Sequence, residues 1–176
     1  MSEETKAPAA AKEEAPKPVD PRETAAQAVL DTIKGRIVAQ FGEAVLEAAQ
    51  LAKYLPTLLI KNEHFREVAT FLKTEPTLAF TYPEMMAGTD YKEYMEVVAL
   101  LHSFELDKDV LIKVRTPREN PTVQSLVPLF GGFNWEEREI FDLLGIRFEG
   151  HPDLRKIMLS DDWQGHPLRK DYVVMD

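Results

Sequence analysis

Apolar residues recur at helical spacing in two stretches of the first half of the chain. In the first stretch they stand at positions 26, 29, 30, 33, 37 and 41, which predicts an amphipathic helix over residues 21–41. Thr24 is its expected N-cap, and Gly42 follows its last turn. In the second stretch Asn62 precedes apolar residues at positions 65, 68, 69 and 72. We therefore expect a helix that is capped by Asn62 and ends near Pro76.

Runs of aliphatic and aromatic residues predict β-strands at residues 45–47, 57–61, 78–82, 94–104 and 110–115. In the last run apolar residues alternate, at positions 110, 112 and 114, as in a strand with one buried face. Residues 105–109 should form the turn of a β-hairpin between the last two strands.

The remaining parts of this region are predicted to be irregular. Residues 82–91 contain Pro83 and Gly88, and residues 116–124 are polar and rich in proline, so both are predicted loops. Ser125 is expected to cap a short helix that ends at Phe130, before two glycines.

This order of elements predicts an α+β fold: a mixed sheet with helices packed on one face, followed by an extended irregular C-terminal lasso. The chain has 176 residues, 44% of them apolar, which suits one domain with tails. Residues 1–20 are rich in Ala, Glu, Lys and Pro without an apolar face, and are predicted to be a disordered tail. We expect residues 21–133 to form the α+β core, and residues 134–176 to form a helix and a charged segment that docks on partner subunits.

The helix of this C-terminal segment has clear end signals. Asn134 is a suitable N-cap, and Glu137 stands where it could complete a capping box. Gly145 should end the helix because glycine tolerates the left-handed conformation. Arg138 and Asp142 are four residues apart, so they are expected to form an ion pair on the helix surface.

From residue 150 onward the chain is dense in turns and charges, and we call this part the lasso. Gly-His-Pro-Asp-Leu-Arg-Lys at residues 150–156 recurs, one residue shorter, as Gly-His-Pro-Leu-Arg-Lys at residues 165–170. Each proline disfavours a helical conformation of the histidine before it, so each unit should be an extended turn that presents a leucine and a basic pair. So many charges and aromatic residues in one segment favour a surface shaped to a partner over a solvated face.

Charge and cysteine content exclude several classes of function. The net charge of −9 argues against nucleic acid and against direct binding to anionic lipid. The chain has no cysteine, so it forms no disulfide and ligates no iron–sulfur cluster through thiolates. It has no apolar run of ~18 residues and no apolar leader at its start, which predicts a cytoplasmic location by default.

Few residues suggest chemistry of their own. His151 and His166, with aspartates at positions 153, 161 and 162, could bind a divalent ion in a small metal-dependent enzyme. The simpler expectation is that each imidazole hydrogen-bonds backbone within its own turn. Ser125 lacks the context of a hydrolase nucleophile, and neither a phosphate loop nor a dinucleotide fingerprint is present.

The C-terminal segment resembles a known family. The residues that carry the resemblance are Trp135-x-Glu137-Arg138-Glu139-x-x-Asp142-x-x-Gly145, then Gly-His-Pro-x-Leu-Arg at 150–155 and Gly-His-Pro-Leu-Arg-Lys-Asp-Tyr at 165–172. This pattern closely resembles the thirty-kilodalton (C) subunit of respiratory complex I, the NADH:quinone oxidoreductase. Residues 41–133 resemble the same family more weakly, through the order of their strands and helices.

The resemblance implies a cofactor-free structural subunit in the peripheral arm of a proton-translocating NADH:quinone oxidoreductase, held peripherally on the cytoplasmic side of the cell membrane. Its expected partners are the hydrogenase-like large subunit that forms the quinone site, the terminal iron–sulfur cluster subunit and other peripheral-arm subunits. NAD, FMN, iron–sulfur clusters and quinone would be bound by partner subunits, and the membrane would be reached only through the complex. Residues 134–176 would dock on these partners. The residues expected at the interface are Trp135, Glu137, Arg138, Glu139, Asp142, His151, Arg155, His166, Arg169, Lys170 and Asp171.

Alternatives from the same ancestry are the equivalent subunit of a membrane-bound NiFe hydrogenase, of a formate hydrogenlyase, or of a dehydrogenase fed by ferredoxin or F420. An alternative from another class is a stand-alone interaction adaptor without a redox partner.

Overall fold

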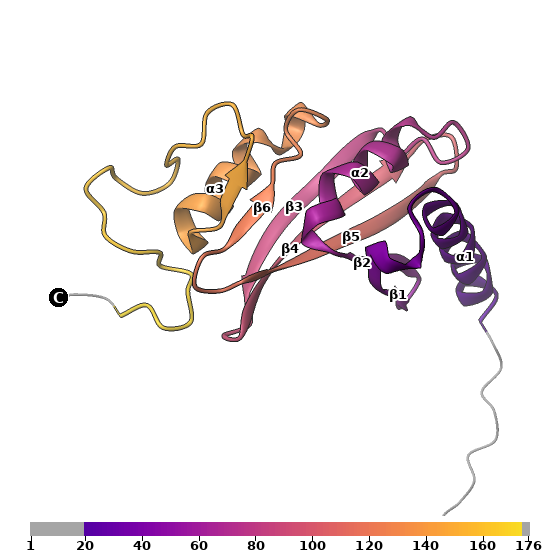
Figure 1. The fold of residues 1–176 in the computed structure, drawn as a ribbon, viewed down its shortest axis with the longest axis horizontal. Helices are drawn as coiled ribbons and strands as arrows, with labels where there is room; N and C mark the ends of the chain where they lie inside the picture. The colour runs from indigo at the N-terminus through magenta and orange to yellow at the C-terminus, as the bar shows by residue number, and fades with distance from the viewer. Residues whose placement is uncertain (1–19, 174–176) are drawn as a thin grey trace, which may run out of the picture.

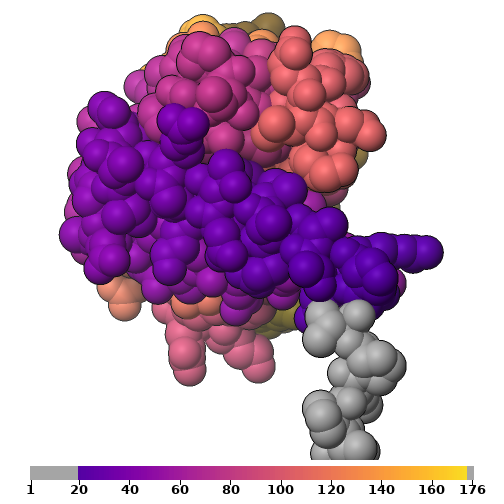
Figure 2. All heavy atoms as spheres, turned by 90° about the vertical axis from the view of Figure 1, so that its right-hand side faces the viewer, coloured from indigo at the N-terminus to yellow at the C-terminus, as the bar shows by residue number. Residues whose placement is uncertain are grey.

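The computed structural model describes residues 20–173 (Figure 1). The predicted disordered tail at residues 1–20 lies outside this range, apart from Asp20. The described chain is elongated. The first helix lies at one end of the long axis and the lasso at the other (Figure 1). Figure 2 views the molecule from the first of these ends, where the first third of the chain covers most of the face.

The core of the protein is a five-stranded mixed sheet with the strand order β1-β2-β5-β4-β3. β2 and β5 run parallel, and the other neighbouring pairs run antiparallel. The predicted hairpin is confirmed, because β4 and β5 pair over their whole length. The strands are β1 (Leu46–Ala52), β2 (Leu55–Ile60), β3 (Tyr82–Asp90), β4 (Tyr94–Ser103) and β5 (Lys108–Pro117).

Three helices contribute side chains to one core beneath this sheet: α1 (Pro21–Phe41), α2 (Phe65–Thr74) and α3 (Asn134–Leu144). The alternation predicted for β5 is confirmed, since Val110, Ile112 and Val114 are all fully buried. On the opposite face of the same strand lie Lys113 and Arg115. The predicted α+β class is therefore confirmed.

Short elements complete the chain. The 3-10 turns η1 (Glu43–Val45), η2 (Asn62–His64) and η3 (Gly131–Phe133) precede β1, α2 and α3. β6 (Thr122–Gln124) pairs in parallel with β7 (Arg147–Glu149), in a small second sheet that ties α3 to the core. Residues 150–173 contain no helix or strand, which confirms the irregular lasso.

Five of the predicted assignments are wrong, because tertiary contacts override the local pattern. Residues 116–124, predicted to be a loop, contain the end of β5 and the strand β6. Residues 82–90 of the predicted loop 82–91 form the edge strand β3, since β4 supplies their hydrogen-bond partners. Residues 78–82 are not a strand: Leu78 and Phe80 are buried, but the backbone turns between them, with Ala79 at φ +44°. The strand predicted at residues 45–47 is instead η1 followed by the longer β1. Residues 125–130 form a turn without a helix.

The predicted helix caps also differ. Asp20 caps α1 in place of Thr24, because its Oδ1 accepts a hydrogen bond from the amide of Arg22 at 2.9 Å. Asn62 does not cap α2. Its side chain donates instead to the backbone carbonyl of Thr122 at 2.7 Å, which connects η2 to β6.

Candidate partner interface

Helix α3 is held close to the sheet at Gly88 of β3. A Cβ built at Gly88 would lie 2.7 Å from Cδ1 of Leu144 and 2.9 Å from Cγ2 of Ile140, so a larger residue would push the helix away. The predicted end at Gly145 is confirmed, with φ +74° in the left-handed region. The predicted N-cap is wrong: Phe133 occupies the cap position without a side-chain bond, and Asn134 is already helical.

Glu137 is buried beneath α3 rather than placed in a capping box. Its Oε1 accepts a hydrogen bond from the amide of Leu126 at 2.6 Å, and within residues 20–173 its Oε2 has no hydrogen-bond partner. Burial raises the pKa of Glu137 to about 7, although hydrogen bonds from residues 125–127 act in the opposite direction. The carboxyl group of Glu137 therefore holds the turn before α3 through its hydrogen bond to Leu126. Its burial there disfavours the charged form.

This buried carboxyl group predicts a pH-dependent stability. The folded-state pKa of about 7 lies above the ordinary value of 4.5, so the folded state binds a proton that the unfolded state has released. Protonation of Glu137 therefore stabilises the folded state fully below pH 4.5. This stabilisation, roughly 2–4 kcal/mol in total, is lost as the pH rises through 7. We expect Glu137→Gln to show less loss of unfolding free energy between pH 5 and 8 than the native chain, by urea titration. An unchanged pH dependence in the variant would contradict this assignment.

Asp142 is also buried, and it holds the middle of the lasso. Its Oδ2 accepts hydrogen bonds from three consecutive amides, of Ile157, Met158 and Leu159, at 3.1, 2.8 and 2.9 Å. Burial acts to raise the pKa of Asp142, but these three donors outweigh it and hold the pKa below its usual value.

The predicted ion pair between Arg138 and Asp142 is wrong. Arg138 donates through Nε to the carbonyl of Arg155 at 3.1 Å and through Nη2 to the carbonyl of Lys156 at 3.2 Å. Both partners of the predicted pair thus bind consecutive backbone groups of the lasso, between residues 155 and 159. Because Arg138 and Asp142 bind peptide groups, the attachment of the lasso to α3 depends on the backbone conformation of residues 155–159 and not on their side chains.

Both histidines bind backbone groups, but the expectation that each would do so within its own turn is correct only for the Nδ1 contact of His151; His166 reaches helix α3 instead. His151 has Nε2 3.3 Å from the carbonyl of Asn134, and its Nδ1 accepts from the amide of Asp153 at 2.9 Å. His166 donates through Nδ1 to the carbonyl of Asp142 at 2.8 Å. Among residues 20–173, neither histidine belongs to a group of three or more possible metal ligands.

The end of α3 is covered by the second Gly-His-Pro turn. Arg169 donates through Nε to the carbonyl of Leu144 at 2.7 Å, and the amide of Leu168 donates to the carbonyl of Leu143 at 3.0 Å. These bonds satisfy carbonyl groups that the helix end would leave free. Gly145 permits the approach, since a Cβ there would lie 2.6 Å from Nη2 of Arg169.

An ionic cluster centred on the buried Asp90 anchors the last residues of the lasso to the core. Asp90 is 3% exposed and is bound bidentately by Arg118, with both N–O distances 2.9 Å. Arg118 also binds Asp171 at 2.5 Å, and the amide of Lys170 donates to Asp90 at 2.9 Å. The hydrogen bonds from Arg118 outweigh the effect of burial and hold the pKa of Asp90 far below its usual range. Asp90 and Arg118 were not predicted as site residues, because both lie in segments predicted to be loops.

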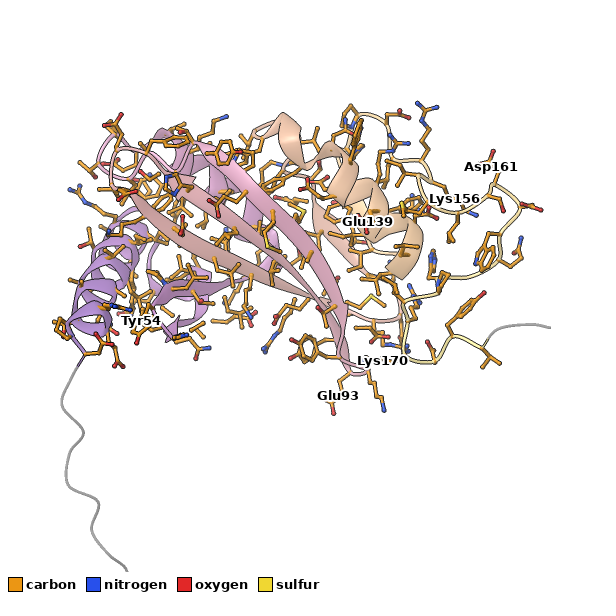
Figure 3. All side chains as sticks on the ribbon, turned by 180° about the vertical axis from the view of Figure 1, so that it is seen from behind. Tyr54, Glu93, Glu139, Lys156, Asp161 and Lys170 are labelled. Carbon is orange, nitrogen blue, oxygen red and sulfur yellow. The ribbon has the colours of Figure 1, made fainter. Side chains whose placement is uncertain are left out.

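Several predicted interface residues face outward. Trp135 is 71% exposed, and the side chains of Glu139 and Arg155 lie on the surface. Figure 3 shows Lys156 and Asp161 toward the tip of the lasso, and Lys170 beside the turn that holds Glu93. Of the two leucines that the Gly-His-Pro turns were predicted to present, Leu168 is exposed, whereas Leu154 packs against the core. The lasso also exposes the apolar side chains of Met158, Trp163 and Val173.

The comparisons with known proteins agree with this architecture. Residues 58–176 match the family described as respiratory-chain NADH dehydrogenase, 30 Kd subunit. The C subunit of NADH-quinone oxidoreductase from Roseiflexus sp. (strain RS-1) is 40% identical over 143 residues, which cover 80% of this chain and 82% of the relative. The same subunit of Chlorobium phaeobacteroides is 36% identical over 141 residues, with 78% and 84% coverage.

Solved structures have the same fold. The trypsin-resistant fragment (1-134) of Nqo5 superposes with a TM-score of 0.57 at 25% identity, covering 69% of this chain and 99% of the fragment. A chain of the archaeal membrane-bound sulfane sulfur reductase has a TM-score of 0.68 at 20% identity, with 82% and 86% coverage, and supports the fold alone.

These matches place the chain among the subunits of respiratory NADH dehydrogenases. It belongs to the family of the 30 kDa subunit, the C subunit of NADH-quinone oxidoreductase. The resemblance carried by residues 134–172 is thereby confirmed. Among residues 20–173, none of the helices combines the length and the apolar character that a membrane span requires.

Proposed function

We propose that the chain is a structural subunit of the peripheral arm, and that α3 and the lasso dock it on the hydrogenase-like large subunit beside the quinone site. The observation that carries this proposal is the concentration of exposed apolar side chains on one segment: Trp135, Met158, Trp163, Leu168 and Val173. Aromatic and aliphatic anchors of this kind supply most of the binding energy of protein interfaces. Glu139, Arg155 and Lys170 would form its charged rim.

The way in which the lasso is held supports the same proposal. Arg138, Asp142, His166 and Arg169 use their hydrogen bonds on backbone groups of α3 and the lasso. These bonds order the lasso before the partner binds, so little conformational entropy is lost on association. In this proposal the internal hydrogen bonds fix the shape, while the exposed tryptophans and leucine make the contact.

The chemistry of electron transfer is assigned to other subunits. A chain without cysteine offers no thiolate to an iron–sulfur cluster, so NAD, FMN, the clusters and quinone would be bound by partner chains. The terminal iron–sulfur subunit would be a second neighbour of this chain. The chain would be peripheral, on the cytoplasmic side of the cell membrane, and would reach the membrane only through the assembled complex.

The test is Trp135→Ala in the native organism, with the complex measured on native gels by NADH:quinone activity. We expect the variant to lower the amount of assembled complex severalfold, because a buried tryptophan anchor contributes ~2 kcal/mol or more to an interface. The unfolding temperature of the isolated chain should change little, since Trp135 is 71% exposed there.

Phe104→Ala is the matched control. Phe104 is 68% exposed but follows β4 at the end of the sheet away from the lasso, so its loss should leave assembly intact. Normal assembly of the Trp135 variant, or equal loss in both variants, would count against docking through α3 and the lasso. Affinity purification from solubilised membranes then identifies the partners, and co-purified nickel with hydrogen turnover would favour the hydrogenase branch instead.

A further inference from the structure

A second cluster of ionisable side chains lies at the opposite end of the sheet from the lasso. Glu84 of β3, His102 of β4 and Asp109 of β5 come from three neighbouring strands. Each offers one ligand atom, and these atoms all lie within 4.8 Å of one another. The cluster is far from the Asp90 anchor, because β3 and β4 have those residues at opposite ends of the same hairpin.

The strand register brings these three residues together. His102 and Asp109 are directly opposite each other in the β4–β5 pair, and Nδ1 of His102 is 2.7 Å from Oδ1 of Asp109. In β3 the register shifts between Pro83 and Met85, so Glu84 is an extra residue at a bulge. Such a bulge re-aims a side chain relative to its strand, and here the carboxylate of Glu84 joins the other two groups.

The charge of the cluster is not balanced within the described chain. Asp109 pairs with His102 alone, and Glu84 has no ion-pair partner among residues 20–173. His102 is mostly covered, with 17% of its side chain exposed, and the ring of Phe104 lies 4.7 Å from the imidazole in an edge-on contact. Two carboxylates thus face a partly desolvated imidazole beside an aromatic wall, and within residues 20–173 no lysine or arginine forms an ion pair with them.

We propose that Glu84, His102 and Asp109 bind a divalent transition-metal ion of the zinc type. One imidazole nitrogen and two carboxylate oxygens are ligands that Zn²⁺ accepts, and water would complete a tetrahedral site. Ligand atoms around such an ion stand ~3.3 Å apart, so the His102–Asp109 pair opens slightly and the surface carboxylate of Glu84 moves inward. The ion would join three adjacent strands at the end of the sheet.

The experiment is a calorimetric titration of ZnCl₂ into the purified, tag-free full chain at neutral pH. We expect saturable binding of one ion per chain and a higher unfolding temperature in the presence of Zn²⁺. His102→Ala should weaken binding by at least tenfold. Glu84→Gln should also weaken it, and this variant tests the site without disturbing the fold, because Glu84 is exposed and makes no ion pair in the described chain.

His64→Ala is the matched control. His64 also lies near two carboxylates, 3.7 Å from Glu63 and 3.0 Å from Glu67, but all three belong to one short stretch of chain. Retained binding in this variant, together with loss in the other two, would support the site. Absence of saturable binding, binding that survives both the His102 and Glu84 substitutions, or equal loss with His64→Ala would overturn it.

Discussion

Replacing Asp142 by alanine is expected to release the middle of the lasso from α3 and to lower the free energy of unfolding by about 3–5 kcal/mol, because three hydrogen bonds to a charged group are lost and water replaces them only in part. The carboxylate of Asp142 is almost fully buried and accepts three consecutive amides of residues 157–159. Alanine would leave these amides without an acceptor, and each lost bond to a charged group costs about 1.5–3 kcal/mol unless water replaces it. Urea unfolding of the isolated chain measures the loss.

Limited trypsin digestion shows where the loss is located. In the variant, cleavage after Arg155 and Lys156 should accelerate, because the adjacent backbone is no longer held. Glu139→Ala is the control, since Glu139 is a carboxylate on the same helix that lies on the surface. If the two variants unfold and digest alike, the contacts of Asp142 do not hold the lasso.

Gly145→Ala is expected to have the second largest effect and to displace the final turn of the lasso. An alanine at φ +74° is strained by about 1–3 kcal/mol. Its Cβ would also meet the imidazole of His166 and lie 2.6 Å from Nη2 of Arg169. Both side chains would have to move, and their hydrogen bonds to the carbonyls of Asp142 and Leu144 would be lost.

Hydrogen exchange can localise this change. The amides of Leu168 and Arg169 should exchange faster in the variant, while those of β4 and β5 keep their protection. Gly35→Ala is the matched control: Gly35 lies within α1, nothing stands within 4 Å of an added Cβ, and the substitution should be neutral or stabilise by up to ~1 kcal/mol. Unchanged protection at residues 168 and 169 would contradict the role assigned to Gly145.

The fold could be predicted where the local pattern and the tertiary structure agree. The helix at residues 21–41 has apolar residues at helical spacing that form one buried stripe, and the hairpin joins an apolar run to an alternating strand, so both were predicted correctly. β3 was missed because Pro83 and Gly88 are poor strand residues. The sheet tolerates them, since Pro83 lies beside a register shift and Gly88 faces α3. Neither contact can be inferred from the local sequence of β3, because β4 and α3 supply the contacting residues.

The candidate interface was predicted at the level of the segment but not of individual contacts. Sequence spacing suggested a surface ion pair between Arg138 and Asp142, whereas both side chains bind the lasso backbone. Peptide groups carry no sequence signature, so a side chain that binds them cannot be recognised from spacing. The same holds for Glu137, whose acceptor role depends on the amide of Leu126 in a turn outside its helix. The interface role of the exposed residues, Trp135 above all, stays a prediction.

The long-range anchors of the lasso have a consequence for synthesis on the ribosome. The amide of Lys170 reaches Asp90 across 80 residues, a length of chain that takes ~4–16 s to translate at typical rates. During that interval the carboxylate of Asp90 lacks its hydrogen bond from the amide of Lys170. Asp142 lacks its full set of three amide donors until Leu159 has been synthesised. The nascent sheet can therefore form first, and the lasso can close over α3 only when the last residues emerge. A chain that ends before Ile157 would leave Asp142 without all three amide donors and Asp90 with Arg118 as its partner but without the amide of Lys170.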